Sequence, residues 1–168
     1  MYFCYCLFCE TSKCKKVVAL IKNMGIDKCI SPQIVKRQRK AGKNIDLTFD
    51  LLPGYVFIYS DKEIKDVSQL KVQGVIRILG SNNAGYCLEG NDYTFALGLL
   101  ERGGVIDVMR VLRTGDTVSV DDTLFDGCNG RIIKIDYRKQ RANVEFLFAG
   151  INYHSWVACD VINIADDV

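Results

Sequence analysis

The stretch LLPGYVFIYSD, residues Leu51 to Asp61, decides the fold of the front half of the chain. Its central run, YVFIY, consists of aromatic and β-branched residues, which is typical of a strand buried on both faces. Pro53 cannot donate a ladder hydrogen bond, so it fits at the start of a strand. Gly54 permits a backbone turn and the close approach of another chain. We therefore expect a strand that carries the Pro-Gly pair near its start.

The side chains of this strand alternate between two faces. Tyr55 and Phe57 share one face, and Val56 and Ile58 share the other. Because both faces are apolar, both must be buried. One face would pack on helices of the same domain, and the other is free to become a docking surface; the resemblance described below favours the face of Tyr55 for this role. The alternative is that both aromatic residues belong to the core.

The neighbouring sequence supplies the other elements of an α/β sandwich. Ser12 can cap a helix in which apolar residues recur at helical spacing until Gly25 ends it. Asn91 or Asp92 can cap a second helix. The expected strands are 3–9, 29–30, 51–59 and 75–79, and the expected helices are 14–24, a short one within 61–70, and 93–102.

The character of the sequence changes near residues 110–115. Beyond this point, β-branched and aromatic segments alternate with turn residues, which predicts a small, strongly bent β-barrel. Phe125 is expected to fill the core of this barrel, and Gly130 to allow a strand to bend. The expected strands are 117–120, 130–137, 142–148 and 155–164.

The composition limits the class of protein. The chain has 168 residues, of which 49% are hydrophobic and 25% charged, and this is typical of one medium or two small globular domains. No apolar run approaches the roughly 18 residues that a membrane span needs. The N-terminus is apolar first and basic second, the reverse of a secretory signal. We therefore expect a cytoplasmic protein with no membrane partner.

Cysteine is unusually frequent. Four of the eight cysteines, Cys4, Cys6, Cys9 and Cys14, lie close together in the sequence. A zinc protein is one interpretation, but no CxxC pair is present and the only histidine is His154. The other interpretation, which we favour, is that reduced cysteines serve as small core hydrophobes and that no metal is bound.

The sequence contains no recognisable catalytic arrangement. The two common glycine-rich phosphate-binding motifs are absent. The spacing between His154 and the cysteines singles out no nucleophile pair, and the carboxylates are scattered. We therefore expect a binding module that is not an enzyme and needs no cofactor.

Positive charge is concentrated in the first third of the chain. Residues 1–48 hold ten Lys/Arg and three Asp/Glu, a net charge of +7, whereas residues 49–115 carry −1 and residues 116–168 carry −4. This asymmetry favours a polyanionic partner near one face. The densest basic segment forms an expected hairpin or exposed loop and contains Lys36, Arg37, Arg39, Lys40 and Lys43. The alternative is a solvated loop without a ligand.

A second group of basic residues, Arg138, Lys139 and Arg141, lies in the expected turn 137–141 of the barrel. Charged residues at a hairpin tip often serve only solubility. Contact with RNA or with a ribosomal protein is the functional alternative.

Two motifs resemble a known family. LLPGYVFIYSD is similar to the strand-entry motif in the N-terminal (NGN) domain of NusG-type transcription factors. GDTVSVDDTLFDGCNGRIIKIDYRKQRANVEFLFAG, residues 115–150, is similar to their KOW motif. The resemblance implies an α+β protein: an NGN-like sandwich with an antiparallel sheet flanked by helices at 1–108, a short linker at 109–115 and an SH3-like KOW barrel at 116–168.

Within this family the chain looks most similar to the specialised LoaP-type antiterminators. The segments that carry this similarity are NDYTFALGLLERGG, the compact linker VIDVMRVLRTGDTVSV and IDYRKQRANVEF. The housekeeping elongation factor, which usually has a longer linker, is the alternative. A ribosome- or RNA-binding KOW protein is a second alternative.

The resemblance also implies partners. NusG-type factors dock on the clamp helices of the large subunit of RNA polymerase, and the matching positions here are Tyr5, Pro53, Gly54, Tyr55 and Phe57. Cys4 stands where the family usually has tryptophan, and Phe3 could compensate. A nascent RNA hairpin or non-template DNA would contact the basic segment, and a ribosomal protein or other factor would bind the KOW domain. The factor is expected to be a monomer.

Overall fold

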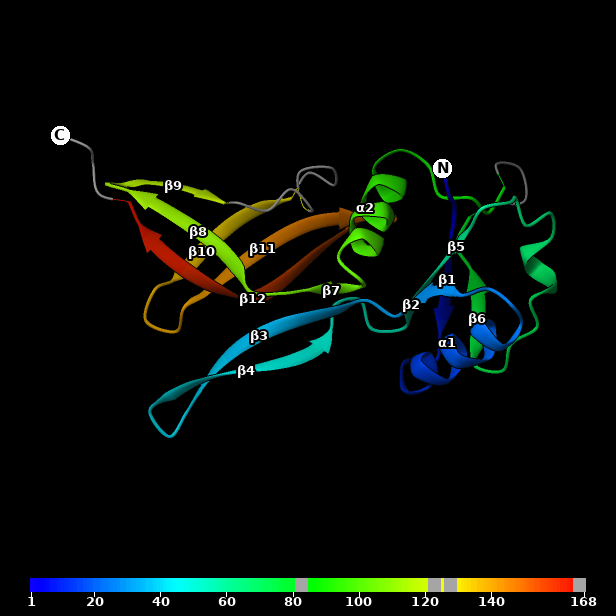
Figure 1. Cartoon of the computed structure of the whole chain (residues 1–168), viewed down its shortest axis with the longest axis horizontal. Helices are drawn as coiled ribbons and strands as arrows, with labels where there is room; N and C mark the ends of the chain where they lie inside the picture. The colour runs from blue at the N-terminus through cyan, green and yellow to red at the C-terminus, as the bar shows by residue number, and fades with distance from the viewer. Residues whose placement is uncertain (81–84, 121–124, 126–129, 165–168) are drawn as a thin grey trace. The chain divides into compact units, whose positions relative to one another are not determined.

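The structure, a computed structural model, describes residues 1–80, 85–120, 125 and 130–164. The chain divides into two compact units (Figure 1). Unit 1 contains Met1–Pro32 and Asp50–Gly104, and unit 2 contains Gln33–Phe49 and Val105–Val168. Helices and strands occur together, so the predicted α+β class is confirmed. The boundaries differ from the predicted 1–108 and 116–168, because residues 33–49 group with the second half of the chain.

Unit 1 is built around a four-stranded sheet with the order β2-β5-β1-β6, in which the neighbouring strands are antiparallel. The predicted strands and both longer helices are present, and the short helix within 61–70 is a single 3₁₀ turn. The elements are β1 (Phe3–Cys9), η1 (Thr11–Lys13), α1 (Cys14–Asn23), β2 (Lys28–Ile30), β5 (Tyr55–Ser60), η2 (Val67–Gln69), β6 (Val75–Ile78) and α2 (Gly90–Glu101).

One face of this sheet packs against α2. Tyr55 and Phe57 share that face, as the alternation predicted. The Phe57 ring meets the Phe95 ring edge-on, with 6.4 Å between centroids. The Tyr59 hydroxyl donates a hydrogen bond of 2.7 Å to the Ala96 carbonyl. These contacts fix α2 on the sheet.

The opposite face packs against α1. Val56 and Ile58 form a common core with Val17 and Ile21 of α1, and all four side chains are buried. The chain's own helices therefore cover both faces of β5. The expectation that the face of Tyr55 stays open for a partner is wrong, because Tyr55 is 7% exposed and Phe57 is completely buried.

Unit 2 contains a five-stranded sheet with the order β10-β11-β12-β8-β9. Its longest strand, β12, pairs with β11 in antiparallel fashion and, further along, with β8 in parallel. A single strand therefore serves two parts of the sheet. The strands are β8 (Met109–Thr114), β9 (Thr117–Val120), β10 (Arg131–Asp136), β11 (Arg141–Phe148) and β12 (Ile151–Asn163).

Strand β8 occupies the segment that was predicted to be a linker, residues 109–115. Its side chains alternate between buried Met109 and Val111 and the exposed Arg110. This alternation is the pattern of a half-buried strand, so the segment joins the sheet and does not separate two domains.

The core of unit 2 confirms the predicted role of Phe125, whereas Gly130 lies just before β10 and is needed for close packing, not for the predicted bend of a strand. Phe125 is buried, and its ring lies 5.5 Å from that of Phe146. The Gly130 amide donates a hydrogen bond of 2.6 Å to the Phe125 carbonyl. A Cβ on Gly130 would overlap the Cβ of Phe125, so only glycine fits at this point.

The basic segment is a hairpin, one of the two forms that the sequence predicted. Strands β3 (Gln33–Lys40) and β4 (Lys43–Asp50) are joined by Ala41 and Gly42, whose φ angles are 48° and 78°. Two central residues with positive φ are characteristic of a type I′ turn. On its other side β3 pairs in parallel with β7 (Val105–Ile106). We call residues 33–50 the basic hairpin.

Arg37 fastens the basic hairpin within unit 2, and we call its contacts with Asp46 and Asp160 the Arg37 clamp. Its Nε and Nη2 atoms lie 2.7 and 2.8 Å from the Asp46 carboxylate, and its Nη1 lies 2.9 Å from the Asp160 carboxylate. The same Nη1 donates to the Cys159 carbonyl at 3.0 Å. Only 10% of the Arg37 side chain is exposed. Hydrogen bonding from Arg37 lowers the pKa of Asp46, and the pKa of Arg37 is raised.

Replacing Phe57→Ala is expected to destabilise unit 1 by about 3–5 kcal/mol, because it removes a fully buried ring and leaves a cavity beneath α2. Chemical denaturation followed by tyrosine and tryptophan fluorescence measures this loss. Ile76→Ala, at a 59% exposed position of β6, is the matched control and should cost less than about 1 kcal/mol. Equal losses in the two variants would contradict the assignment of Phe57 to the core.

Replacing Arg37→Met is expected to loosen the basic hairpin by about 1–3 kcal/mol, because it leaves two carboxylates without their hydrogen-bond donor. Hydrogen exchange of the amides of residues 33–49 measures the change. Arg131→Met removes an arginine that is 72% exposed and paired with Glu145, so it should change this protection by at most about 1 kcal/mol. Unchanged protection in Arg37→Met would show that the clamp is not needed.

The same clamp should respond to pH. The pKa of Asp46 is lowered from 3.8, so its contribution to stability is complete above that pH and is lost as the pH falls through the lower, folded-state value. We expect protection of the hairpin amides, corrected for intrinsic exchange rates, to fall below about pH 4 in the wild type. Arg37→Met should lack this step.

Candidate functional site

The structure brings the two basic segments of the sequence together. Gln140 lies in the turn between β10 and β11, and its side-chain oxygen accepts hydrogen bonds from Arg37 at 3.3 Å and Asn44 at 3.4 Å. The basic hairpin and this turn, residues 137–140, therefore lie side by side. Gln140 is 103 positions after Arg37 in the sequence and 96 positions after Asn44. Both project toward the same end of unit 2 (Figure 1). We call residues 137–140 the basic turn.

Local backbone geometry shapes the basic turn. Gln140 has a φ of 47°, a left-handed conformation that returns the chain into β11. The Asp136 carboxylate accepts the Lys139 backbone N–H at 3.0 Å, and this hydrogen bond lowers the pKa of Asp136. The turn is therefore held by the backbone and by a side chain that stays ionised, and its cationic side chains need not contribute.

Several of the predicted nucleic-acid contacts are occupied within the chain. Arg37 is the clamp described above. Arg141 lies 4.4 Å above the Trp156 ring and 3.4 Å from the Asp136 carboxylate. Lys36 lies 5.3 Å from the centroid of the Phe49 ring. Arg37 and Arg141 contribute little free positive charge because they are paired with carboxylates, whereas the ammonium group of Lys36 keeps its charge.

The remaining predicted cations are available. Among the residues that the structure describes, these side chains form no ion pair, and all except the half-buried Lys139 are exposed. They are Arg39, Lys40 and Lys43 on the basic hairpin and Arg138 and Lys139 on the basic turn.

The predicted polymerase contacts do not form one patch. Tyr5 pairs with Ile58, so it lies on the sheet face opposite to that of Tyr55. Tyr5 is buried against α1, and its hydroxyl accepts the Ile64 N–H at 2.9 Å. Burial is the main cause of the raised pKa of Tyr5. The sequence could not show this separation, because it depends on the register between β1 and β5.

The close approach predicted at Gly54 is made by the chain itself. A Cβ at this position would lie 3.0 Å from the Phe8 ring and 3.1 Å from the Cys9 carbonyl. The Cys9 N–H donates to the Gly54 carbonyl at 2.7 Å. Tyr55 packs on Phe8 at 5.3 Å, so of the Pro-Gly-Tyr run only Pro53 is exposed.

Unit 1 has an apolar hollow of about 340 Å³ at the start of β1 and α2. Phe3, which is 36% exposed, lies in it, and the Tyr93 hydroxyl donates to the Tyr2 carbonyl at 3.1 Å. Sequence reasoning named only Phe3 among its lining residues. The signal that it passed over is the composition of α2, in which apolar residues occur on all sides. The hollow is lined by Met1, Tyr2, Phe3, Cys87, Leu88, Glu89, Gly90 and Tyr93.

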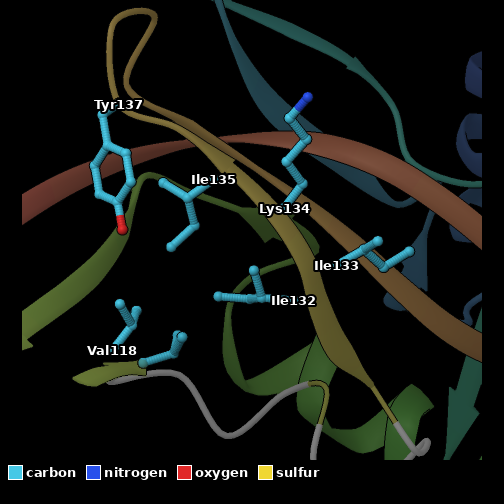
Figure 2. Close-up of a pocket in the computed structure, with 7 residues that line it drawn as sticks. Val118, Ile132, Ile133, Lys134, Ile135 and Tyr137 are labelled. Atoms are coloured by element: carbon cyan, nitrogen blue, oxygen red, sulfur yellow. The ribbon is translucent and has the colours of Figure 1, made fainter. Parts of the chain in front are cut away.

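Unit 2 has a second apolar hollow, of about 450 Å³, between β9 and β10 (Figure 2). Ile132, Ile135 and Tyr137 point toward Val118 across the space, whereas Lys134 points away from it (Figure 2). A β-bulge between Ile132 and Lys134 shifts the register of β10. Such irregularities turn side chains out of a regular sheet, and Ile133 is exposed here.

The cysteines are free thiols in the described part of the chain. Burial raises the pKa of Cys4, Cys9 and Cys29 to about 12, so these thiols stay protonated. Within residues 1–80, 85–120, 125 and 130–164, no group of His, Cys, Asp and Glu side chains is arranged to hold a metal ion. Across the same residues, no helix has the length and apolar character needed to cross a membrane.

Comparison with known proteins identifies the family. The family described as "Transcription termination factor nusG" matches residues 4–92. A solved structure, "Domain interaction in Thermotoga maritima NusG", is similar in fold, with a TM-score of 0.54, 17% sequence identity and 94% of each chain covered. No sequence among the curated proteins matches. Because the family match spans more than half of the 168 residues, the chain belongs to the NusG family, whose members are transcription factors that bind RNA polymerase and are not enzymes.

Proposed function

We propose that this chain is a processive antitermination factor of the LoaP type. It binds elongating RNA polymerase in the cytoplasm as a monomer and is recruited to particular long operons by a nucleic-acid signal. The observation that carries the proposal is the gathering of free cations on the basic hairpin and the basic turn. Recruitment by a nucleic-acid signal requires a polyanion-binding site of this kind.

The polymerase contact is proposed to involve the apolar hollow of unit 1. The clamp helices of the large subunit would place an apolar side chain beside Phe3 and Tyr93, with exposed Pro53 as a further contact. Tyr5, Gly54, Tyr55 and Phe57 would then act through the fold of unit 1 and not at the contact itself, since β1 and β5 pair Tyr55 with Phe8 and Ser60 with Phe3. A ligand that binds only the closed polymerase shifts its equilibrium by the coupling free energy, typically about 1–3 kcal/mol. This is enough to change read-through when many pauses follow one another.

Residues 116–168 of unit 2 are proposed to be the KOW domain and to recruit a second protein, such as a ribosomal protein. The support is the apolar hollow between β9 and β10, where Val118 and Ile133 are exposed. Residues of this kind gather at protein interfaces when they form a contiguous patch.

Two alternatives remain distinct from this proposal. A housekeeping NusG-type elongation factor would act on any template. A ribosome- or RNA-binding KOW protein would bind RNA without binding polymerase, and the family match over residues 4–92 argues against it.

Addition of the protein to a purified transcription reaction is expected to raise read-through of a terminator several-fold when the template carries the recruiting leader. Arg39→Glu combined with Lys40→Glu and Lys43→Glu should abolish the increase, because charge reversal repels the nucleic acid. Gel quantification of terminated and full-length RNA measures both. Equal stimulation on templates with and without the leader would identify the housekeeping type instead.

Phe3→Glu is expected to weaken binding to core RNA polymerase at least tenfold, because a charge would enter an apolar contact at the cost of its desolvation. Phe3 is 36% exposed in the free protein, so the fold should persist. The control Ile76→Glu places the same charge at an exposed position of β6. If both variants bind polymerase like the wild type in a pull-down titration, the hollow is not the contact.

A further inference from the structure

We propose that the basic hairpin and the basic turn form one composite site for the phosphate backbone of a base-paired stem, and that Arg37 and Gln140 are positioning residues of this site. The inference rests on the proposed function, since it specifies the nucleic acid that recruits the factor. A composite site differs from two independent basic segments because a single ligand must contact both the basic hairpin and the basic turn.

The first step is the juxtaposition. The Gln140 side-chain oxygen accepts hydrogen bonds from both Arg37 and Asn44. Asn44 is adjacent to Lys43, and Gln140 is adjacent to Lys139. The contacts therefore place the cations of the basic hairpin next to those of the basic turn, and one extended polyanion can reach both.

The second step is the charge balance. Arg37 carries one positive charge between the carboxylates of Asp46 and Asp160, so these three side chains together have a net charge of −1. Arg141 balances Asp136. The five remaining cations of the basic hairpin and the basic turn outweigh this single negative charge, so the region keeps a positive field that an external polyanion can meet.

The third step is the chemistry of the ligand. Single-stranded nucleic acids bind through bases stacked on aromatic side chains. The tip of the basic hairpin, residues 36–44, contains no aromatic residue. The guanidinium of Arg113 lies 5.3 Å from the centroid of the Tyr137 ring, and that of Arg141 lies 4.4 Å from the centroid of the Trp156 ring. One face of each ring is therefore already in contact with an arginine. Contact with phosphates along a double-stranded stem therefore fits the site better than stacking on unpaired bases.

The fourth step is the role of the clamp. Arg37 is 10% exposed and donates hydrogen bonds to Asp46, Asp160, Cys159 and Gln140. Because its guanidinium is buried among these acceptors, we do not count it among the phosphate contacts. Its effect on the ligand is to hold the hairpin at a fixed distance from the turn, so that fewer conformations are lost on binding.

The test measures binding of a fluorescent RNA stem-loop to the full chain by anisotropy over a range of KCl concentrations. One variant, Arg39→Gln with Lys43→Gln, removes two cations of the hairpin. A second, Arg138→Gln with Lys139→Gln, removes two cations of the turn. The matched control, Arg131→Gln with Lys134→Gln, removes two exposed cations of β10 that lie outside the proposed site.

Each site variant is expected to weaken binding roughly tenfold or more and to lower the slope of log K against log salt by about 2, since each phosphate contact contributes about 0.9. The control should keep the wild-type slope. Arg37→Met and Gln140→Ala should also weaken binding several-fold although neither removes a free cation. A DNA duplex of the same sequence should bind within an order of magnitude of the RNA stem, and single-stranded RNA should bind more weakly.

Loss of binding in the hairpin variant with none in the turn variant would overturn the composite site and leave recruitment by the hairpin standing. Tighter binding of single-stranded RNA than of the stem would overturn the assignment of the ligand. The proposed function is judged separately by the transcription assay. A protein that binds the stem as described but never raises read-through would refute antitermination and keep the site.

Discussion

The ion pair between Arg37 and the carboxylates of Asp46 and Asp160 is the interaction on which the arrangement of unit 2 depends. A planar guanidinium offers donors in a fixed fork, so it can meet a carboxylate through two nitrogens and still serve other acceptors. Arg37 uses this geometry to bind Asp46 within the hairpin and Asp160 on β12. A lysine at the same position could satisfy one of these partners well but could not hold both strands in register.

This interaction matters because a two-stranded ribbon is marginally stable by itself. The basic hairpin has a polar tip and buries few apolar residues beyond Ile34, which lies at the base of β3. Parallel pairing of β3 with β7 fixes that base, and Arg37 fixes the ribbon further toward its tip. Free cations can then be displayed on a backbone that does not have to order itself when a ligand arrives.

Much of the fold was predictable from local patterns. The apolar run YVFIY, the helical spacing in α1 and the alternation in β11 each determine an element through a periodicity that needs no partner. The strand β8 carried the same alternation, with buried Met109 and Val111, and resemblance to a linker concealed it. In that segment, physical periodicity was a better guide than the family pattern.

Two features of the candidate site were beyond the sequence, and both depend on pairing between distant segments. Strand composition showed that Tyr55 and Phe57 must be covered, but not that the Phe8 ring packs on Tyr55 and that Phe95 of α2 packs on Phe57. The register that places Tyr5 on the other face follows from how β1 meets β5. In the same way, a count of Lys and Arg could not separate Arg37, which is neutralised by acids from β4 and β12, from Arg39, which forms no ion pair with any residue that the structure describes.

The two proposed binding sites differ in their physical chemistry, and this difference would separate the two proposed binding events. A phosphate contact is driven by release of counterions and weakens steeply as salt rises. An apolar contact such as the hollow around Phe3 depends on removing surface from water and is little affected by ionic strength. Under the proposed function, attachment to polymerase through unit 1 would persist after the recruiting stem is released, because loss of the electrostatic contact does not weaken the hydrophobic one. A factor with these two proposed sites would be loaded at one place on a transcript and would remain attached to polymerase far beyond it.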